Sequence, residues 1–182
     1  KFDDTISALE TAFEDSSGSA KANIRSQLAA VLVEKGEFDT ALNHINDALD
    51  NDPESGKFLY QKATIFMQMK EHENAIPIFD DLLALNEWNH EVLANRAESF
   101  MATKQYANAK EDYEKLQSLT PNDPRMYLRF AQIAEAQNSA AEELKNYELF
   151  LKYLEQDSVP ATELEQIQKR VEELRAAQDT TP

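Results

Sequence analysis

The chain of 182 residues contains no cysteine, only three glycines and a single tryptophan. Without cysteine the protein has no disulfides, no thiolate metal ligands and no cysteine nucleophile. So few glycines leave no glycine-rich phosphate loop and no nucleophile elbow. No apolar run approaches the roughly 20 residues that a membrane-spanning helix needs. These absences exclude several classes of enzyme and argue against direct insertion of this segment into a membrane.

Positive charge is also scarce. The 18 lysines and arginines stand against 34 aspartates and glutamates, which gives a net charge of −16. Such a surface repels phosphate backbones, so nucleic acid is not an expected partner. The hydrophobic content of 42% is ordinary for a folded soluble protein, and the length is sufficient for a sizeable core.

What the sequence does contain is alanine at a fixed interval. One series is formed, at steps of 34 residues, by Ala29, Ala63, Ala97 and Ala131, and a second by Ala41, Ala75 and Ala109. Small residues at a long fixed period mark sites where two helices approach closely in every copy of a repeated unit. The two series are 12 residues apart, which leaves room for two short helices and a turn. The spacing predicts a stack of helical hairpins.

The first repeat shows this most clearly. Leu28 and Leu32 give an apolar face at helical spacing, and Gly36 ends that helix because glycine readily adopts the backbone conformation of a C-terminal cap. A second helix carries Ala41 on its apolar stripe and stops at Pro53, since proline cannot continue the hydrogen-bond ladder.

This pattern resembles the tetratricopeptide repeat family over about residues 22–155. The segments that carry the resemblance are Leu28-Ala29-x-x-Leu32, Ala41-x-x-x-Ile45 with Pro53, Ala75-x-x-x-Phe79 and Ala109-x-x-x-Tyr113. The resemblance implies an all-α, right-handed α-solenoid of antiparallel helix hairpins with a C-terminal capping helix. It also implies that the first helices of the repeats line a concave groove for partner peptides.

We expect a single array over residues 1–182. Its predicted segments are a partial N-terminal helix at 1–21, repeats at 22–55, 56–89, 90–123 and 124–157, and a capping helix with a frayed tail at 158–182. The first segment carries Ile6, Leu9 and Phe13 in the manner of the second helix of a preceding repeat. The last helix, predicted to begin at Ser158, has a narrow apolar stripe and otherwise polar faces, as expected of a helix that ends a stack. From Ala176 onward we expect fraying.

Some residues depart from the repeat pattern. Glu143 replaces the second-helix alanine of the fourth repeat, which leaves the packing of that helix open. Ser139 and Glu142 are spaced as a capping box for the same helix. Pro77 is placed in the first turn or so of its helix, where proline is tolerated. Trp88 is predicted to fill the joint between the second and third repeats, with an exposed binding position as the alternative.

The predicted groove follows from helical spacing, since residues three, four and three positions apart share one face. Its members are Lys57, Tyr60, Thr64 and Met67 in the second repeat, Glu91, Ala94, Glu98 and Met101 in the third, Arg125, Leu128, Gln132 and Glu135 in the fourth, and the flanking Asn95 and Arg129. Met67 and Met101 occupy equivalent places one repeat apart. Adaptable contact area for a partner and simple shielding of the core edge are both open interpretations of the two methionines.

A carboxylate anchor within the groove is implied by the resemblance. Some family members hold the C-terminal carboxylate of a bound peptide with lysines, asparagines and an arginine from three consecutive repeats. Asn95, Arg125 and Arg129 match three of those places, whereas Tyr60 and Thr64 break the pattern at the others. The two arginines are one helical turn apart and could fork onto a carboxylate. The favoured alternative is that they pair with Glu98, Asp123 or Glu135 on a wet surface.

The function predicted from these patterns is a protein-interaction scaffold that binds a partner peptide in the groove. The alternative is a structural module whose N-terminal edge continues a longer array or joins a second copy. We expect no enzyme activity, no cofactor and no metal, because the three histidines have no ligand spacing and no nucleophile motif is present. The chain begins without methionine, which fits either export of a processed protein to a bacterial envelope or a cytoplasmic fragment.

Overall fold

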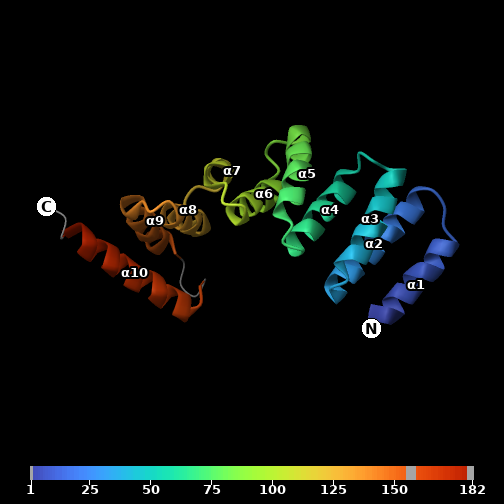
Figure 1. Ribbon diagram of the computed structural model, residues 1–182, viewed down its shortest axis with the longest axis horizontal. Helices are drawn as coiled ribbons and strands as arrows, with labels where there is room; N and C mark the ends of the chain where they lie inside the picture. The colour runs from blue at the N-terminus through green and yellow to red at the C-terminus, as the bar shows by residue number, and fades with distance from the viewer. Residues whose placement is uncertain (1, 155–158, 180–182) are drawn as a thin grey trace. The chain divides into compact units, whose positions relative to one another are not determined.

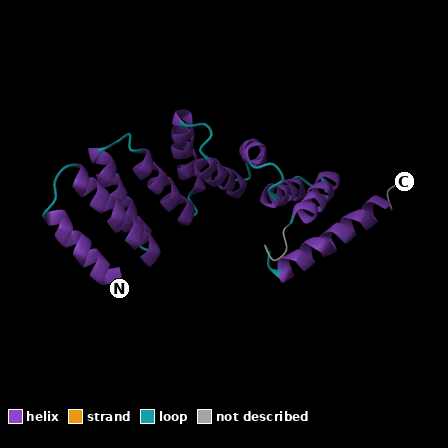
Figure 2. Cartoon of the chain, turned by 180° about the vertical axis from the view of Figure 1, so that it is seen from behind, coloured by secondary structure: helices purple, strands orange, loops and turns teal. Residues whose placement is uncertain are grey.

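A computed structural model describes residues 2–154 and 159–179, and these residues form ten helices and no strand (Figures 1 and 2). The helices are α1 (Phe2–Glu14), α2 (Ser19–Lys35), α3 (Phe38–Asn51), α4 (Gly56–Gln68), α5 (His72–Leu85), α6 (His90–Ala102), α7 (Tyr106–Leu119), α8 (Pro124–Ala136), α9 (Ala140–Tyr153) and α10 (Ala161–Asp179). The predicted start of the last helix at Ser158 and the end of the predicted tail at 180–182 lie outside the described residues.

The chain divides into two compact units, Lys1–Thr103 and Lys104–Pro182. In the N-terminal unit α2 packs against α3 and α4 against α5, while α1 covers α2 and α6 follows on α5. In the C-terminal unit α7, α8, α9 and α10 pack in chain order. The division falls between α6 and α7, inside the repeat predicted for 90–123, and the single array over residues 1–182 stays a prediction.

Both alanine series lie in the core. Each of these alanines is 0% or 1% exposed. In the first hairpin, Ala29 of α2 and Ala41 of α3 share one apolar cluster with Ile45 and with Ile65 of α4. A methyl group is all that fits between two helix backbones at such a contact, so the period of the alanines sets the places where the helices meet.

The turn inside each hairpin has the same left-handed backbone conformation in all four repeats. The residues with positive φ there are Gly36 at 85°, Lys70 at 64°, Lys104 at 60° and Asn138 at 57°, again 34 positions apart. In the second repeat the Glu71 N–H donates to the Phe66 carbonyl at 2.9 Å and the Lys70 N–H to the Met67 carbonyl at 3.0 Å. These paired bonds form a Schellman cap that satisfies the last carbonyls of the helix.

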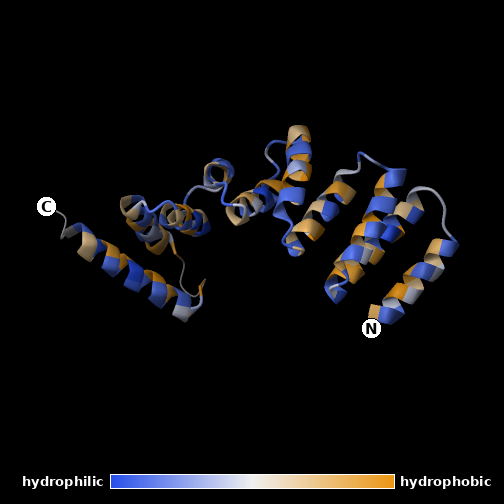
Figure 3. Cartoon of the chain, viewed as in Figure 1, coloured by the Kyte–Doolittle hydropathy of each residue, from blue (hydrophilic) through white to orange (hydrophobic). Residues whose placement is uncertain are grey.

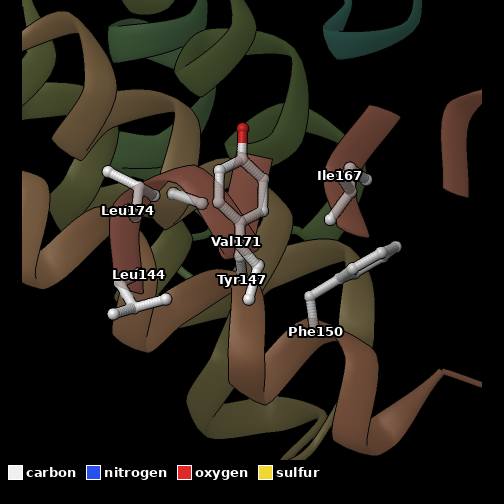
Figure 4. Packing of buried hydrophobic residues seen from close by; sticks show 7 residues of the cluster. Leu144, Tyr147, Phe150, Ile167, Val171 and Leu174 are labelled. Atoms are coloured by element: carbon white, nitrogen blue, oxygen red, sulfur yellow. The ribbon is translucent and has the colours of Figure 1, made fainter. Parts of the chain in front are cut away.

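The apolar core of the C-terminal unit lies between α9 and α10. Leu144, Tyr147 and Phe150 of α9 gather with Ile167, Val171 and Leu174 of α10 (Figure 4). Along α10 hydrophobic and hydrophilic segments alternate (Figure 3), as expected of a helix with one narrow apolar stripe. The prediction that this helix covers a hydrophobic face is therefore confirmed for the described residues.

Glu143 shows how α9 packs without its alanine. Its carboxylate is 2% exposed and accepts two hydrogen bonds from Arg170 of α10, from Nε at 2.7 Å and from Nη2 at 3.0 Å. The carboxylate in turn raises the pKa of the Arg170 guanidinium, chiefly through this hydrogen bond. A bidentate ion pair thus takes the place of an alanine contact where α9 meets the capping helix.

Several sequence predictions are wrong in detail. α5 begins at His72, so Pro77 lies in the second turn, where its exposed position lets water reach the carbonyl that loses its N–H partner. Trp88 is 48% exposed and donates from Nε1 to Glu87 at 3.1 Å, so it does not fill the joint. Ser139 is the N-cap of α9, but its side chain makes no capping bond. α10 continues to Asp179 instead of fraying at Ala176.

The left-handed turns predict a stabilising substitution. Lys70→Gly should raise the free energy of unfolding by about 0.5–1 kcal/mol, because glycine adopts positive φ without the Cβ penalty of lysine. Gly36→Ala is the matched opposite. No atom lies within 4 Å of a Cβ built at Gly36, so its loss of about 1 kcal/mol would come from the backbone alone. Urea unfolding measures both, and a destabilised Lys70→Gly variant would contradict the left-handed turn.

The buried ion pair predicts an asymmetry between two arginines of α10. Arg170→Ala should lower the free energy of unfolding by about 1–3 kcal/mol, since Glu143 is left buried without its partner. Arg175 also pairs with a glutamate of α9, Glu148, but both side chains are largely exposed, at 59% and 43%. Arg175→Ala should therefore cost no more than about 1 kcal/mol. Equal losses in chemical denaturation would contradict a special role for Glu143.

Candidate functional site

The predicted groove residues of α4 and α6 meet through side chains one repeat apart. The Asn95 amide Nδ2 donates to the Tyr60 hydroxyl at 2.7 Å. The Tyr60 ring also lies against Phe79 of α5, with ring centroids 6.3 Å apart. Burial, followed by the negative charge of Glu91, raises the pKa of Tyr60, so the phenol stays neutral at physiological pH. Tyr60, Glu91 and Asn95 thus form one polar group on this face.

α2 and α4 are joined in the same way. The Lys57 Nζ donates to the Asn23 side-chain oxygen at 3.2 Å, and the buried Ser26 hydroxyl donates to Gln61 Oε1 at 2.6 Å. The groove predicted from the sequence begins at the second repeat and does not include the α2 positions. The signal was present in the period, because 34 residues before Lys57 and Thr64 stand Asn23 and Ala30.

We call the surface formed by α2, α4 and α6 the first-helix face. It consists of Asn23, Ala30, Val33, Glu34, Lys57, Tyr60, Thr64, Met67, Glu91, Ala94, Asn95, Glu98 and Met101. Every one of these residues is half-buried or exposed. The half-buried state of Met67 and Met101 is compatible with both contact to a partner and shielding of the core, so their role stays a prediction.

A hollow of about 210 Å³ lies between α2 and α4 on this face. Its walls are formed by Ala29, Ala30, Val33, Glu34, Gln61, Thr64 and Ile65. Two adjacent alanines create the space, because a larger side chain at either position would fill it. Thr64, whose hydroxyl donates to the Gln61 carbonyl at 2.8 Å, belongs both to the predicted groove and to this hollow.

The remaining groove predictions lie on α8, in the C-terminal unit. Arg125 forks onto Asp123, the residue that caps α8, with its Nη2 2.7 Å from the Asp123 carboxylate. Its guanidinium lowers the pKa of the Asp123 carboxyl through this hydrogen bond. This pairing is the predicted alternative for Arg125. Arg129 donates to Gln132 at 3.0 Å. Leu128 and Gln132 are half-buried, and Glu135 is exposed.

The carboxylate anchor needs Asn95 of the N-terminal unit together with Arg125 and Arg129 of the C-terminal unit. Asn95 already donates to Tyr60, and Arg125 already pairs with Asp123. An incoming carboxylate would therefore meet side chains that already hold other partners. The anchor stays a prediction.

A larger cleft, of about 620 Å³, lies outside the predicted groove between α1, α2 and α3. Its lining comprises Ser7, Glu10, Thr11, Phe13, Glu14, Arg25, Leu28 and His44. Arg25 forms an ion pair with Asp47 and lies over the Phe13 ring, 4.7 Å from its centroid. The Nδ1 atom of His44 is buried and has no hydrogen-bond partner in the described part of the chain. Burial, followed by the charge of Arg25, lowers the pKa of His44 against the opposing effect of Asp47 and Glu10.

Two kinds of feature are absent from the described residues. No group of three or more histidine, aspartate or glutamate side chains is placed to hold a metal ion there. None of the helices in residues 2–154 and 159–179 combines the length and the apolar character needed to cross a bilayer.

Comparison with known families identifies the repeats. Two family models, each described as tetratricopeptide repeat, match residues 27–87 and 90–123. The chain belongs to the tetratricopeptide repeat family, as its alanine series and turn positions predict. Proteins of this family bind protein partners, so the chain is a protein-interaction scaffold in that general sense. The family is generally non-enzymatic.

Solved structures of other proteins share this fold. A crystal structure of MamA is 19% identical, with a TM-score of 0.72 over 84% of this chain and 88% of that one. A MamA RS-1 double mutant gives 13% identity and a TM-score of 0.76 over 87% and 89%. A tetratricopeptide repeat protein from Parabacteroides merdae gives 17% and 0.80 over 95% and 65%. At these identities the likeness shows the fold, a helical solenoid of this type. No curated protein matches the sequence significantly.

His44 predicts a pH dependence of stability. Because its pKa in the folded protein lies below the ordinary value of 6.5, the unfolded chain binds the proton more tightly. The stability associated with neutral His44 is complete above about pH 6.5 and falls as the pH drops below that value. His44→Gln should remove this part of the pH dependence in urea unfolding between about pH 7.5 and 5.5. An unchanged profile in the variant would contradict the assignment.

Proposed function

We propose that the first-helix face of the N-terminal unit binds a segment of a partner protein. The observation that supports this most strongly is the continuity of the face across three repeats. Side chains of α2 and α4 bond to each other, and side chains of α4 and α6 do the same, as in the Asn95–Tyr60 pair at 2.7 Å. A partner segment laid across the three helices would meet one connected surface.

The physical state of the side chains favours binding. Association is opposed by the entropy lost when flexible side chains become ordered. Tyr60, Asn95 and Lys57 are already held by hydrogen bonds, so ordering them on binding would cost little. Met67 and Met101 supply unbranched, polarizable side chains that adapt to different partner surfaces. The face thus combines fixed polar groups with adaptable apolar ones.

The α8 positions Arg125, Leu128, Arg129 and Gln132 extend this proposal to the C-terminal unit as separate contacts. Arg125 is the most accessible of them, with 81% of its side chain exposed. The proposal requires no catalytic step, cofactor or metal.

Self-association through the N-terminal edge is a second candidate function. One observation favours it: α1 contains no buried residue, and Phe2 is 40% exposed. The Ile6 side chain does pack against the cluster around Ala29 and Ile45, so part of the apolar stripe of α1 is already used within the chain. A second copy would have to bind the remaining face of α1.

One experiment distinguishes partner binding at the first-helix face from self-association through α1. The double variant Met67→Ala/Met101→Ala should lose at least about tenfold in affinity for a partner purified with the wild type, since two apolar contacts disappear. Its mass by light scattering should equal that of the wild type. The triple change of Ile6, Leu9 and Phe13 to serine tests the other function in the same assays.

A partner that binds the methionine double variant as tightly as the wild type would contradict binding at the first-helix face. A wild type that forms dimers, with the serine variant monomeric and folded by circular dichroism, would support the structural function instead. Asp81→Asn on α5 serves as a control, because its side chain is exposed and lies outside the first-helix face.

A further inference from the structure

The hollow between α2 and α4 has the size and lining of a subsite for one side chain. Its volume of about 210 Å³ is below the range of about 300–1,000 Å³ that is usual for small-molecule sites. Ala29, Ala30, Val33 and Ile65 give it apolar walls. Ala30 is exposed, so the hollow opens to solvent on the same face as Thr64.

The polar groups of the hollow differ in what they still offer a ligand. Gln61 is engaged with Ser26, and the Thr64 hydroxyl donates to a backbone carbonyl. The exposed Glu34 side chain has no hydrogen bond or ion pair with any described residue. It also stands in the last turn of α2, where the helix dipole disfavours negative charge. Glu34 is therefore the charged group of this hollow that can pair with a cation on a partner.

We infer that the hollow receives an aliphatic side chain of the partner segment and that Glu34 pairs with a lysine or arginine beside it. The inference rests on the proposed function and specifies the chemistry of the partner. The apolar walls would bury the aliphatic group, and the carboxylate would accept hydrogen bonds from the cation.

Charge favours a basic partner over a second copy of this chain. The net charge of −16 repels another acidic molecule and attracts a basic one. On the first-helix face itself, Glu34, Glu91 and Glu98 outnumber the single Lys57, whose ammonium is bonded to Asn23. A segment with an aliphatic residue next to a basic one meets both features.

The test is selection from a phage-displayed library of random dodecapeptides on the full chain. The selected peptides are then synthesised with a fluorescent label and titrated by anisotropy. We expect the selected sequences to be enriched in Val, Leu, Ile or Met directly beside Lys or Arg. Replacing that aliphatic residue by alanine, or the basic one by glutamine, should weaken binding severalfold.

Two variants of the protein probe the hollow directly. Ala30→Leu fills it and should weaken the selected peptides by about tenfold or more. Glu34→Gln should weaken them severalfold and reduce the salt dependence of binding, because the screened ion pair is gone. The matched controls are Ala107→Leu, the same change, and Asp81→Asn, the corresponding acid-to-amide change. Both are at exposed helical positions outside the face and should bind as the wild type does. Glu34→Gln also keeps the test decisive if Ala30→Leu fails to fold.

Four results would overturn the inference. The first is selected peptides without the aliphatic–basic pair, and the second is equal affinity of the peptides for Ala30→Leu and the wild type. In both cases the proposed function stands if binding is lost in Met67→Ala/Met101→Ala. Failure to select any peptide from the library would contradict the proposed function as well. Dimers of the chain that block the hollow would show a second copy as its occupant.

Discussion

Close contact between helices at alanine is the constraint on which this structure depends. Ala29 and Ala41 of the first hairpin are almost fully buried and share one apolar cluster. A longer side chain at such a contact would force the helices apart, at a cost of about 1–3 kcal/mol. Because the same contact recurs every 34 residues, it fixes which side of each helix faces inward. The side of the first helices next to these alanines is then left at the surface, where the proposed binding face lies.

The period predicted the helices well, because small residues, turn positions and apolar stripes recurred together. It failed where a residue does not reveal its backbone conformation. Glycine at position 36 indicated the first turn in the sequence. Lys70 adopts the same left-handed conformation, but its residue type does not indicate a turn. Nothing in the repeat pattern indicated a partner for the Glu143 carboxylate either. Its partner, Arg170, is 27 positions away in a helix with no place in the repeat, so only the fold brings them together.

The candidate site was predictable only in outline. Helical spacing placed Tyr60 and Met67 at the surface of the first helices, and the described side chains are accessible there. Helical spacing could not show that Tyr60 bonds to Asn95, since this depends on how neighbouring repeats stack. The hollow beside Glu34 was missed for a related reason. A cavity is formed by what two helices leave empty, and a single small residue such as Ala30 does not indicate one in the sequence.

Position-specific crosslinking tests the central claim, that partners bind the first-helix face, most directly. A photoreactive benzoylphenylalanine is introduced into the full chain either at Thr64, on that face, or at Asp81, on α5. After irradiation with a partner already shown to bind the wild type, the crosslinked product is mapped by mass spectrometry. The account predicts a crosslink from position 64 and none from position 81. A crosslink from position 81 alone would contradict it.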